Sequence, residues 1–211
     1  MAYDLEEQEQ IAVIKNWWQT YGTALLTVLV VIMVSVSAYQ WWRYYRVQQS
    51  TLAATLYSQL DTADLSNDPK KVIAIASAIV ANHESSRYAI MAQLRAAKAL
   101  VASVDLAGAV TRLQWTVDHT KEDEIRDIAR LRLAGVLLDQ KKFDESLKLL
   151  AVKPLPAFDG LYAELKADVL ATQLKKTEAR EAYQLALTKL DINSPYRQVL
   201  QIKLDTLGEV R

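Results

Sequence analysis

The longest apolar segment of the chain lies close to its N-terminus. No charged residue occurs between Lys15 and Arg43, and residues 23–38 contain only Thr, Ser, Ala, Leu, Val, Ile and Met. A helix over residues 21–39 is about 28 Å long at ~1.5 Å per residue, close to the ~30 Å thickness of the hydrocarbon core of a bilayer. The pattern therefore predicts a transmembrane helix, which we assign to residues 21–41.

Aromatic residues flank this segment on both sides. Trp and Tyr bury a ring while keeping a hydrogen-bonding group in contact with water, so they gather at membrane–water interfaces. The predicted membrane-interface residues are Trp17, Trp18, Tyr21, Tyr39, Trp41 and Trp42. A buried helix of a soluble protein needs no such aromatic belts, and we therefore favour a membrane anchor in contact with the lipid bilayer.

Processing and orientation of the segment are less clear. A cleaved signal peptide has a basic N-terminal region, whereas residues 1–15 carry four acidic side chains and the single basic side chain of Lys15, so cleavage is the less favoured alternative. Positive charges on the two sides are nearly balanced, with Lys15 before the segment and Arg43 and Arg46 after it. The positive-inside rule therefore leaves the orientation open. The absence of Cys suits an oxidising compartment without proving one.

Residues 42–211 have the periodicity of helices. Apolar residues recur at spacings of three and four, Ala and Leu dominate, and the whole chain contains only five Gly and four Pro. Turn and cap signals divide this part into helices; they lie at residues 66–69, 82–86, 121–124 and 154–160, and at Asp105, Thr177, Ser194 and Pro195. No segment alternates apolar and polar residues for long enough to form a strand. The predicted fold class is all-α.

A pattern of small and large residues repeats three times within this region. The matching sets are Ala97, Leu100, Ala109 and Leu113, then Ala134, Leu137, Ser146 and Leu150, then Ala167, Leu170, Ala179 and Tyr183. The sets begin 37 and then 33 residues apart, near the ~34-residue period of tetratricopeptide repeats. Small residues let paired helices approach closely, and large ones fill the space toward the next pair. We predict a tetratricopeptide-like α-solenoid over residues 42–211. Residues 43–82 fit it loosely, and an irregular helical bundle is the alternative.

Charge and side-chain chemistry narrow the class of function. The 25 basic and 25 acidic residues alternate along the predicted helices, so no basic stripe for nucleic acid is present. The chain has no Cys and only two His, His83 and His119, which argues against a thiolate nucleophile or a metal cluster. It also lacks the phosphate-loop and hydrolase motifs. We predict a binding protein, not an enzyme, with no metal or cofactor.

Taken together, several segments resemble one family. They are the acidic N-terminal residues, Lys15-Asn-Trp-Trp18, Tyr39-Gln-Trp-Trp-Arg-Tyr44, Leu131-Arg-Leu-Ala134, Asp144-Glu-Ser-Leu-Lys-Leu-Leu150, Ala179-Arg-Glu-Ala-Tyr183 and Gln201-Ile-Lys-Leu204. In this order, over essentially the whole chain, they are similar to the YfgM family of Gram-negative bacteria, the ancillary subunits of the SecYEG translocon. The family usually carries more positive charge before its membrane segment than Lys15 alone provides.

The resemblance implies a single-pass protein of the bacterial inner membrane. Residues 1–20 would be a cytoplasmic acidic tail, residues 21–41 the membrane helix, and residues 42–211 a periplasmic helical-repeat domain. The implied partners are the SecYEG translocon and a membrane-anchored, prolyl-isomerase-like periplasmic chaperone, beside which the protein would assist newly exported chains. Two other functions stay open: an envelope-stress regulator that binds a signalling protein through its cytoplasmic tail, and, more weakly, a murein-associated enzyme.

The repeat period also predicts a partner-binding surface. In stacked helix pairs the first helix of each pair lines a concave face that suits a peptide or a partner helix. The residues predicted on that face are Met91, Leu94, Lys98, Val101, Ile128, Leu131, Leu138, Asp139, Leu161, Glu164 and Asp168. Taken singly, Leu94, Leu131 and Leu138 are better explained as packing against a neighbouring helix, so the prediction concerns the set.

Overall fold

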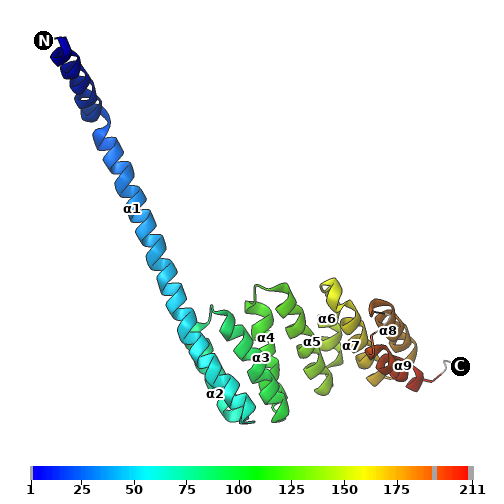
Figure 1. The fold of residues 1–211 in the computed structure, drawn as a ribbon. Helices are drawn as coiled ribbons and strands as arrows, with labels where there is room; N and C mark the ends of the chain where they lie inside the picture. Colours follow the sequence, from blue (N-terminus) through cyan, green and yellow to red (C-terminus); the bar gives the residue numbers. More distant parts are fainter. Residues whose placement is uncertain (1, 192–193, 209–211) are drawn as a thin grey trace. The chain divides into compact units, whose positions relative to one another are not determined.

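The computed structural model describes residues 2–191 and 194–208, and for residues 2–14, 46, 49 and 50 it describes the backbone alone. The described part is helical and contains no strand, which confirms the predicted all-α class. Its elements (Figure 1) are α1 (Ala2–Leu65), α2 (Pro69–His83), α3 (Arg87–Ala102), α4 (Leu106–His119), α5 (Asp123–Asp139), α6 (Phe143–Leu150), the 3-10 helix η1 (Pro156–Phe158), α7 (Asp159–Thr172), α8 (Lys176–Lys189) and α9 (Tyr196–Thr206).

The chain divides into two compact units, Met1–Thr51 and Leu52–Arg211. The first unit contains the part of α1 that ends at Thr51. Its stretch Lys15–Tyr45 is long and apolar enough to cross a membrane, and the rest of the chain buries almost none of it. The acidic side chains predicted to mark the cytoplasmic tail, and that of Arg46, lie outside the described residues. The last residues of α1 belong to the second unit.

The second unit is built from four helix pairs that turn in the same way. The end of α1 shares a core with α2, and α3 pairs with α4, α5 with α6, and α7 with α8. In each turn one residue has a left-handed backbone, namely Asn67, Val104, Lys141 and Leu174, with φ of 53°, 64°, 61° and 63°. The next N–H donates back to the carbonyl five residues earlier, as from Asp105 to Leu100 at 2.9 Å and from Lys142 to Leu137 at 2.8 Å. This is the Schellman ending of a helix, repeated at every pair.

The small residues of the predicted repeat lie where paired helices cross. Ala97, Ala134 and Ala167 are buried, and so are their later partners in the repeat. In the third pair the two small positions bond directly, since the Ser146 hydroxyl donates to the Ala134 carbonyl at 2.8 Å. This contact explains why Ser replaces Ala there, and it confirms the predicted spacing.

The first pair, which fits the sequence pattern only loosely, has the same architecture. Counting back 37 residues from Ala97 and Ala109 leads to Leu60 and Val72, and both are buried in the core formed by α1, α2 and α3. Large side chains therefore stand at this crossing where the later pairs have small ones. The residue types of the first pair do not identify it as one of the repeats, whereas its left-handed turn at Asn67 does.

Two predicted breaks are shifted. Asp159 and Gly160, expected in a break between helices, are the first residues of α7. Gly160 is buried, and a Cβ atom added there would be in ordinary contact with Leu190. Ser194, expected to cap the last helix, precedes the N-cap position, which Pro195 occupies. The proline cannot donate a backbone hydrogen bond, so it loses little at a helix start. Helix α9 then packs against α8 and completes the core of the last pair.

Candidate functional site

The first helices of the second, third and fourth pairs, α3, α5 and α7, carry the predicted partner-binding residues. The left-handed turn residues provide a common reference for comparing them. Lys98, Gly135 and Asp168 each lie six residues before that turn, and Leu94, Leu131 and Glu164 each lie ten residues before it. The same two positions of the helix are therefore Leu and Lys in α3, Leu and Gly in α5, and Glu and Asp in α7.

An open groove lies between α3 and α5. It has a volume of about 460 Å³ and is lined by Ala97, Lys98, Val101, Leu113, Arg132, Gly135, Val136 and Asp139. Three residues of the predicted surface, Lys98, Val101 and Asp139, thus line one site together. Arg132 and Gly135 line it as well, and sequence reasoning missed both. A lone Gly inside a helical pattern signals only a weaker helix, which is why its role was not apparent.

The apolar residues of the predicted surface mostly contribute to the cores. Leu94 is 6% exposed and packs with α5 side chains. Met91 packs against the same core, while Leu131 and Leu138 pack against the core shared by α5 and α7. Ile128 is half-buried and Leu161 is exposed. The structure therefore does not assemble the eleven predicted residues into one continuous exposed surface.

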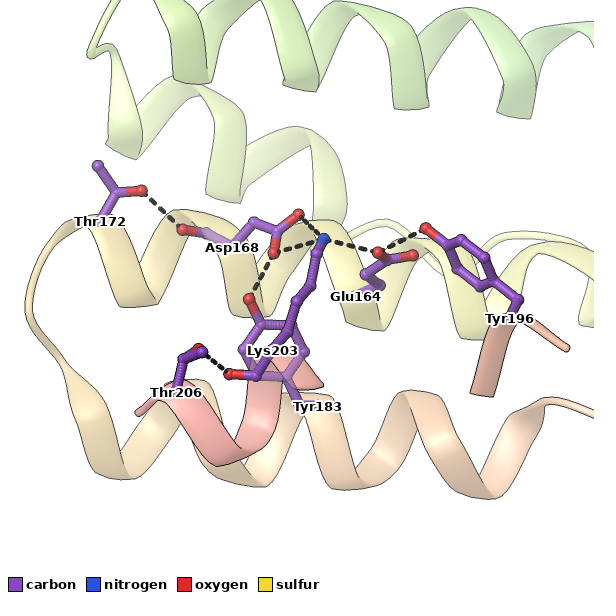
Figure 2. A network of polar contacts seen from close by, with 7 residues as sticks. All are labelled: Glu164, Asp168, Thr172, Tyr183, Tyr196, Lys203 and Thr206. Atoms are coloured by element: carbon purple, nitrogen blue, oxygen red, sulfur yellow. Dashed lines mark hydrogen bonds and ion pairs between the residues drawn. The ribbon is translucent and has the colours of Figure 1, made fainter. Parts of the chain in front are cut away.

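Glu164 and Asp168 face α9 within the chain itself (Figure 2). The Lys203 ammonium group donates to Glu164 Oε1 at 2.8 Å and to Asp168 Oδ2 at 2.9 Å. Tyr196 donates to Glu164 Oε1 at 2.7 Å, and Tyr183 of α8 donates to Asp168 Oδ1. Glu164 is only 6% exposed, so these bonds compensate for the removal of its charge from water.

Burial and hydrogen bonding shift the titration of this network. Burial raises the pKa of Tyr183, and the hydrogen bond to Asp168 raises it further. Burial lowers the pKa of Lys203, but the hydrogen bonds to Glu164 and Asp168 outweigh that effect and leave the pKa above its ordinary value. At neutral pH the amine is therefore charged and both phenols donate. The network attaches α9 to α7, and each of its five side chains has at least one hydrogen-bond partner.

A second buried carboxylate was also missed from the sequence. Asp127 on α5 accepts from the Leu155 backbone N–H at 2.8 Å and from the Tyr162 hydroxyl at 3.3 Å, and Arg130 lies 3.5 Å away. Burial raises the pKa of Tyr162, and the nearby Asp127 charge adds to the rise. These bonds hold the loop before α7 against α5. A buried Asp with such partners has a structural explanation and needs no catalytic one.

The six predicted membrane-interface residues are exposed along α1. Their exposed fractions are 49% for Trp17, 52% for Trp18, 55% for Tyr21, 61% for Tyr39, 72% for Trp41 and 49% for Trp42. The aliphatic residues between the two groups are exposed to a similar degree. In water this would be a large apolar surface, whereas a bilayer would cover it. Contact of these residues with lipid stays a prediction.

Comparisons with known proteins agree with the repeat architecture. Residues 15–209 match the tetratricopeptide repeat-like domain family. A protein of Neisseria gonorrhoeae named ancillary SecYEG translocon subunit is 32% identical, over 98% of this chain and 100% of that protein. Proteins of the same name from Haemophilus influenzae and Escherichia coli are 26% and 24% identical, covering 88% and 96% of this chain and 91% and 97% of their own lengths.

Proposed function

The chain belongs to the family of ancillary SecYEG translocon subunits with a tetratricopeptide repeat-like domain, and from this premise we propose that it is a membrane-anchored binding subunit of the Sec translocon. The observation that carries the proposal is the match to relatives of that name over nearly the full length of both chains. The match includes the apolar helix as well as the helix pairs, so both the anchor and the repeat domain belong to the proposed function.

The anchor in this proposal is the apolar part of α1, with residues 1–20 in the cytoplasm and the repeat domain in the periplasm. The chain then resides in the bacterial inner membrane as a single-pass protein. The double aromatic belt supports the membrane span and the absence of Cys suits the periplasm, while the orientation is taken from the resemblance to the family. A bilayer would also cover the exposed aliphatic side chains of the helix.

The activity we propose is protein binding, in which the domain assists newly exported chains together with a membrane-anchored, prolyl-isomerase-like chaperone. The helix pairs, the open groove between α3 and α5 and the engaged state of the buried carboxylates support binding over catalysis. Within the predicted surface, Lys98, Val101 and Asp139 are the residues best placed to meet a partner. Glu164 and Asp168 would first have to release α9.

The topology can be tested with one cysteine. Ser58 is exposed on α1 within the second unit, and the chain has no other Cys. In intact spheroplasts, Ser58→Cys should react with a membrane-impermeant maleimide, and the wild-type chain is the matched control. Reaction only after the membrane is broken would place the domain in the cytoplasm and contradict the proposal.

The partner can be tested by crosslinking from the groove. A photoreactive amino acid in place of Val101, which lines the groove, should crosslink to translocon subunits or to the chaperone in intact membranes. The control places the same amino acid at Thr111, which is exposed on α4 and does not line the groove. Recovery of a cytoplasmic signalling protein through residues 1–20, with no translocon subunit from either position, would favour the stress-regulator function instead.

A further inference from the structure

We propose that the groove between α3 and α5 binds an amphipathic α-helix of a partner protein, one that presents an acidic and a basic side chain two turns apart with an apolar side chain between them. The inference rests on the proposed function, because it specifies what the partner offers to the repeat domain. It is carried by three observations: the order of charges along α5, the space above Gly135, and the way in which α9 covers α7.

The charges along α5 form a bipolar row. Arg132, Gly135 and Asp139 all line the groove, at positions i, i+3 and i+7, which share one face of a helix. The cation and the anion are therefore separated by about 10 Å along the helix axis. Both side chains are exposed, and within residues 2–191 and 194–208 neither of them makes an ion pair. A ligand with opposite charges two turns apart would satisfy both.

The two basic side chains of α3 nearest the groove already have acidic partners. Arg95, at the position of α3 that matches Arg132, bonds to Asp64 and lies 3.4 Å from Asp61 on α1. Lys98 reaches Asp64 at 4.0 Å, although its side chain stays 71% exposed. Among the charged residues that line the groove, the two without an ion pair in the described part of the chain, Arg132 and Asp139, are therefore both on α5. This contrast argues that the row is a recognition feature and not simply a solvated face.

Gly135 leaves space at the middle of the row. A Cβ atom added there would meet no atom within 4 Å. Around it, Ala97, Val101, Leu113 and Val136 supply an apolar lining. A side chain of a partner can therefore approach the backbone of α5 closely at this point, and an apolar one would lose contact with water there. Any other residue at position 135 would occupy part of that space.

Helix α9 shows that charged residues on the first helix of a pair can hold another helix through complementary groups. Asp168 occupies the position of Gly135, and Glu164 that of Leu131. Across them α9 places Tyr196 and Lys203, which are seven residues apart (Figure 2). Leu200, between these two in the sequence, is fully buried. The helix that covers two carboxylates thus brings a hydroxyl donor, an apolar residue and a cation. By the same rule of charge complementarity, the row on α5 accepts an acid, an apolar residue and a base.

Three stapled helical peptides test the charge rule on the purified full chain in nanodiscs. They share one sequence with a central Leu and differ only at the two outer positions, which are Glu and Lys, Lys and Lys, or Glu and Glu. The wild-type chain should bind the mixed peptide most tightly. Arg132→Glu makes the row acidic and should shift the preference to the peptide with two Lys. Asp139→Arg makes the row basic and should shift the preference to the peptide with two Glu. Each switch should amount to about tenfold in Kd, as for one or two exposed charge pairs. Preferences that stay the same in both variants would overturn the inference.

Filling the space beside Gly135 tests the apolar contact. Gly135→Leu should weaken binding of the mixed peptide at least tenfold, because the leucine fills the space that the peptide side chain would enter. The melting temperature of the domain should stay the same or rise, because Gly is a poor helix former. Ala74→Leu, which adds the same bulk at an exposed position of α2 outside the groove, should change neither. Full binding by Gly135→Leu would exclude the groove. A version of the mixed peptide with a central Pro and no staple cannot form the helix. If it binds as tightly as the stapled peptide, the groove accepts an extended segment, and the proposal of a helical partner is overturned.

The peptide assay and the crosslinking experiment fail in different ways. The peptides are measured on purified protein, so they report on the groove whatever the cellular partner is. Crosslinking from Val101 in membranes reports on the identity of that partner. Loss of the charge switch with translocon crosslinks intact rejects the helix-binding groove alone. An intact charge switch without any translocon or chaperone crosslink rejects the proposed function alone.

Discussion

Helices α5 and α7 begin consecutive pairs and have the same place in the repeat, yet their exposed faces differ in state. On α7 the two carboxylates Glu164 and Asp168 are covered by α9 and bonded to Lys203. On α5 the matching positions are Leu131 and Gly135, and the charges beside them, Arg132 and Asp139, are open in the groove. The covered positions of α7 therefore hold charge, whereas on α5 Leu131 packs toward α7 and the open charges lie at neighbouring positions.

The difference shows that side chains, and not the backbone, decide whether this surface is closed. Both helices end in the same left-handed turn and bury the same small residue at the crossing with their partner, Ala134 in α5 and Ala167 in α7. Glu164 on α7 would be costly to bury alone, and it is buried because a cation and two hydroxyl groups reach the carboxylate pair. Substitutions at the positions that α5 and α7 share, and at the positions where they differ, test this comparison.

The largest effect is expected where the two helices are alike. Ala134→Phe and Ala167→Phe should each destabilise the domain by about 3 kcal/mol or more, because a large ring overpacks a close helix crossing. Both alanines have no exposed surface, so the two losses should be of similar size. Urea unfolding of the full chain in detergent measures them, with Ala74→Phe on the exposed face of α2 as the control. A silent change at either site would mean that its crossing is not close.

Removing the cation should affect only the covered helix. Lys203→Met leaves Glu164 and Asp168 without their shared counter-charge, and we expect a loss of about 2 kcal/mol, reduced from the full cost of breaking a buried pair because the lysine is partly exposed. Hydrogen exchange should increase in α9 and not in α3. The double variant Glu164→Gln with Lys203→Met should recover part of the loss, since a neutral amide is easier to bury. Equal exchange in α9 of wild type and Lys203→Met would show that the core residues alone hold the helix.

Changing the glycine should affect only the open helix. Gly135→Ala should stabilise the domain by about 1 kcal/mol, because Ala is the better helix former and its Cβ meets nothing within 4 Å. Calorimetry should record a higher melting temperature. Gly108→Ala is the contrasting variant, since a Cβ there would lie 2.6 Å from the capping carboxylate of Asp105, and it should destabilise. A fall in melting temperature for Gly135→Ala would mean that the space above it is filled.

The smallest expected effect is a gradual loss of stability around α9 as the pH rises. The folded-state pKa values of Lys203 and Tyr183 lie above their ordinary values, so the folded state holds these protons more tightly than the unfolded chain. Their contribution is complete below about pH 10, where the unfolded groups are protonated, and is lost as pH rises through the folded values. Above that pH, exchange in α9 should increase before exchange in α4, which contacts none of the groups in this network. A simultaneous increase in both helices would contradict the local origin of the effect.

Much of the fold could be predicted from the sequence because its repeat depends on local spacing. Ala97, Ala134 and Ala167 recur at the crossing points, so composition and period sufficed for three pairs. The first pair was harder to recognise because Leu60 and Val72 replace the small residues, and the signal common to all four pairs, a left-handed turn, has no fixed residue type. Asn67, Val104, Lys141 and Leu174 share a conformation and not a side chain.

The candidate site was predictable only in part for a related reason. Period alone placed Lys98, Val101 and Asp139 on one face, and they do line one groove. It could not show that α9 covers Glu164, because that contact joins residues 39 positions apart and depends on how a separate helix docks. Nor could it show the role of Gly135, whose importance is the space beside it.

The uniform turn also has a consequence for how the domain folds. Hydrogen bonds between successive parts of the repeat join residues that are near in sequence, for example 31 positions apart for Arg95 with Asp64 and 39 for Lys203 with Glu164. Short sequence separations of this kind favour rapid folding that spreads from one repeat to the next. During synthesis each pair can therefore close as soon as the following helix has emerged. The carboxylates of α7 follow the same order, since they gain their counter-charge once Lys203 of α9 has emerged.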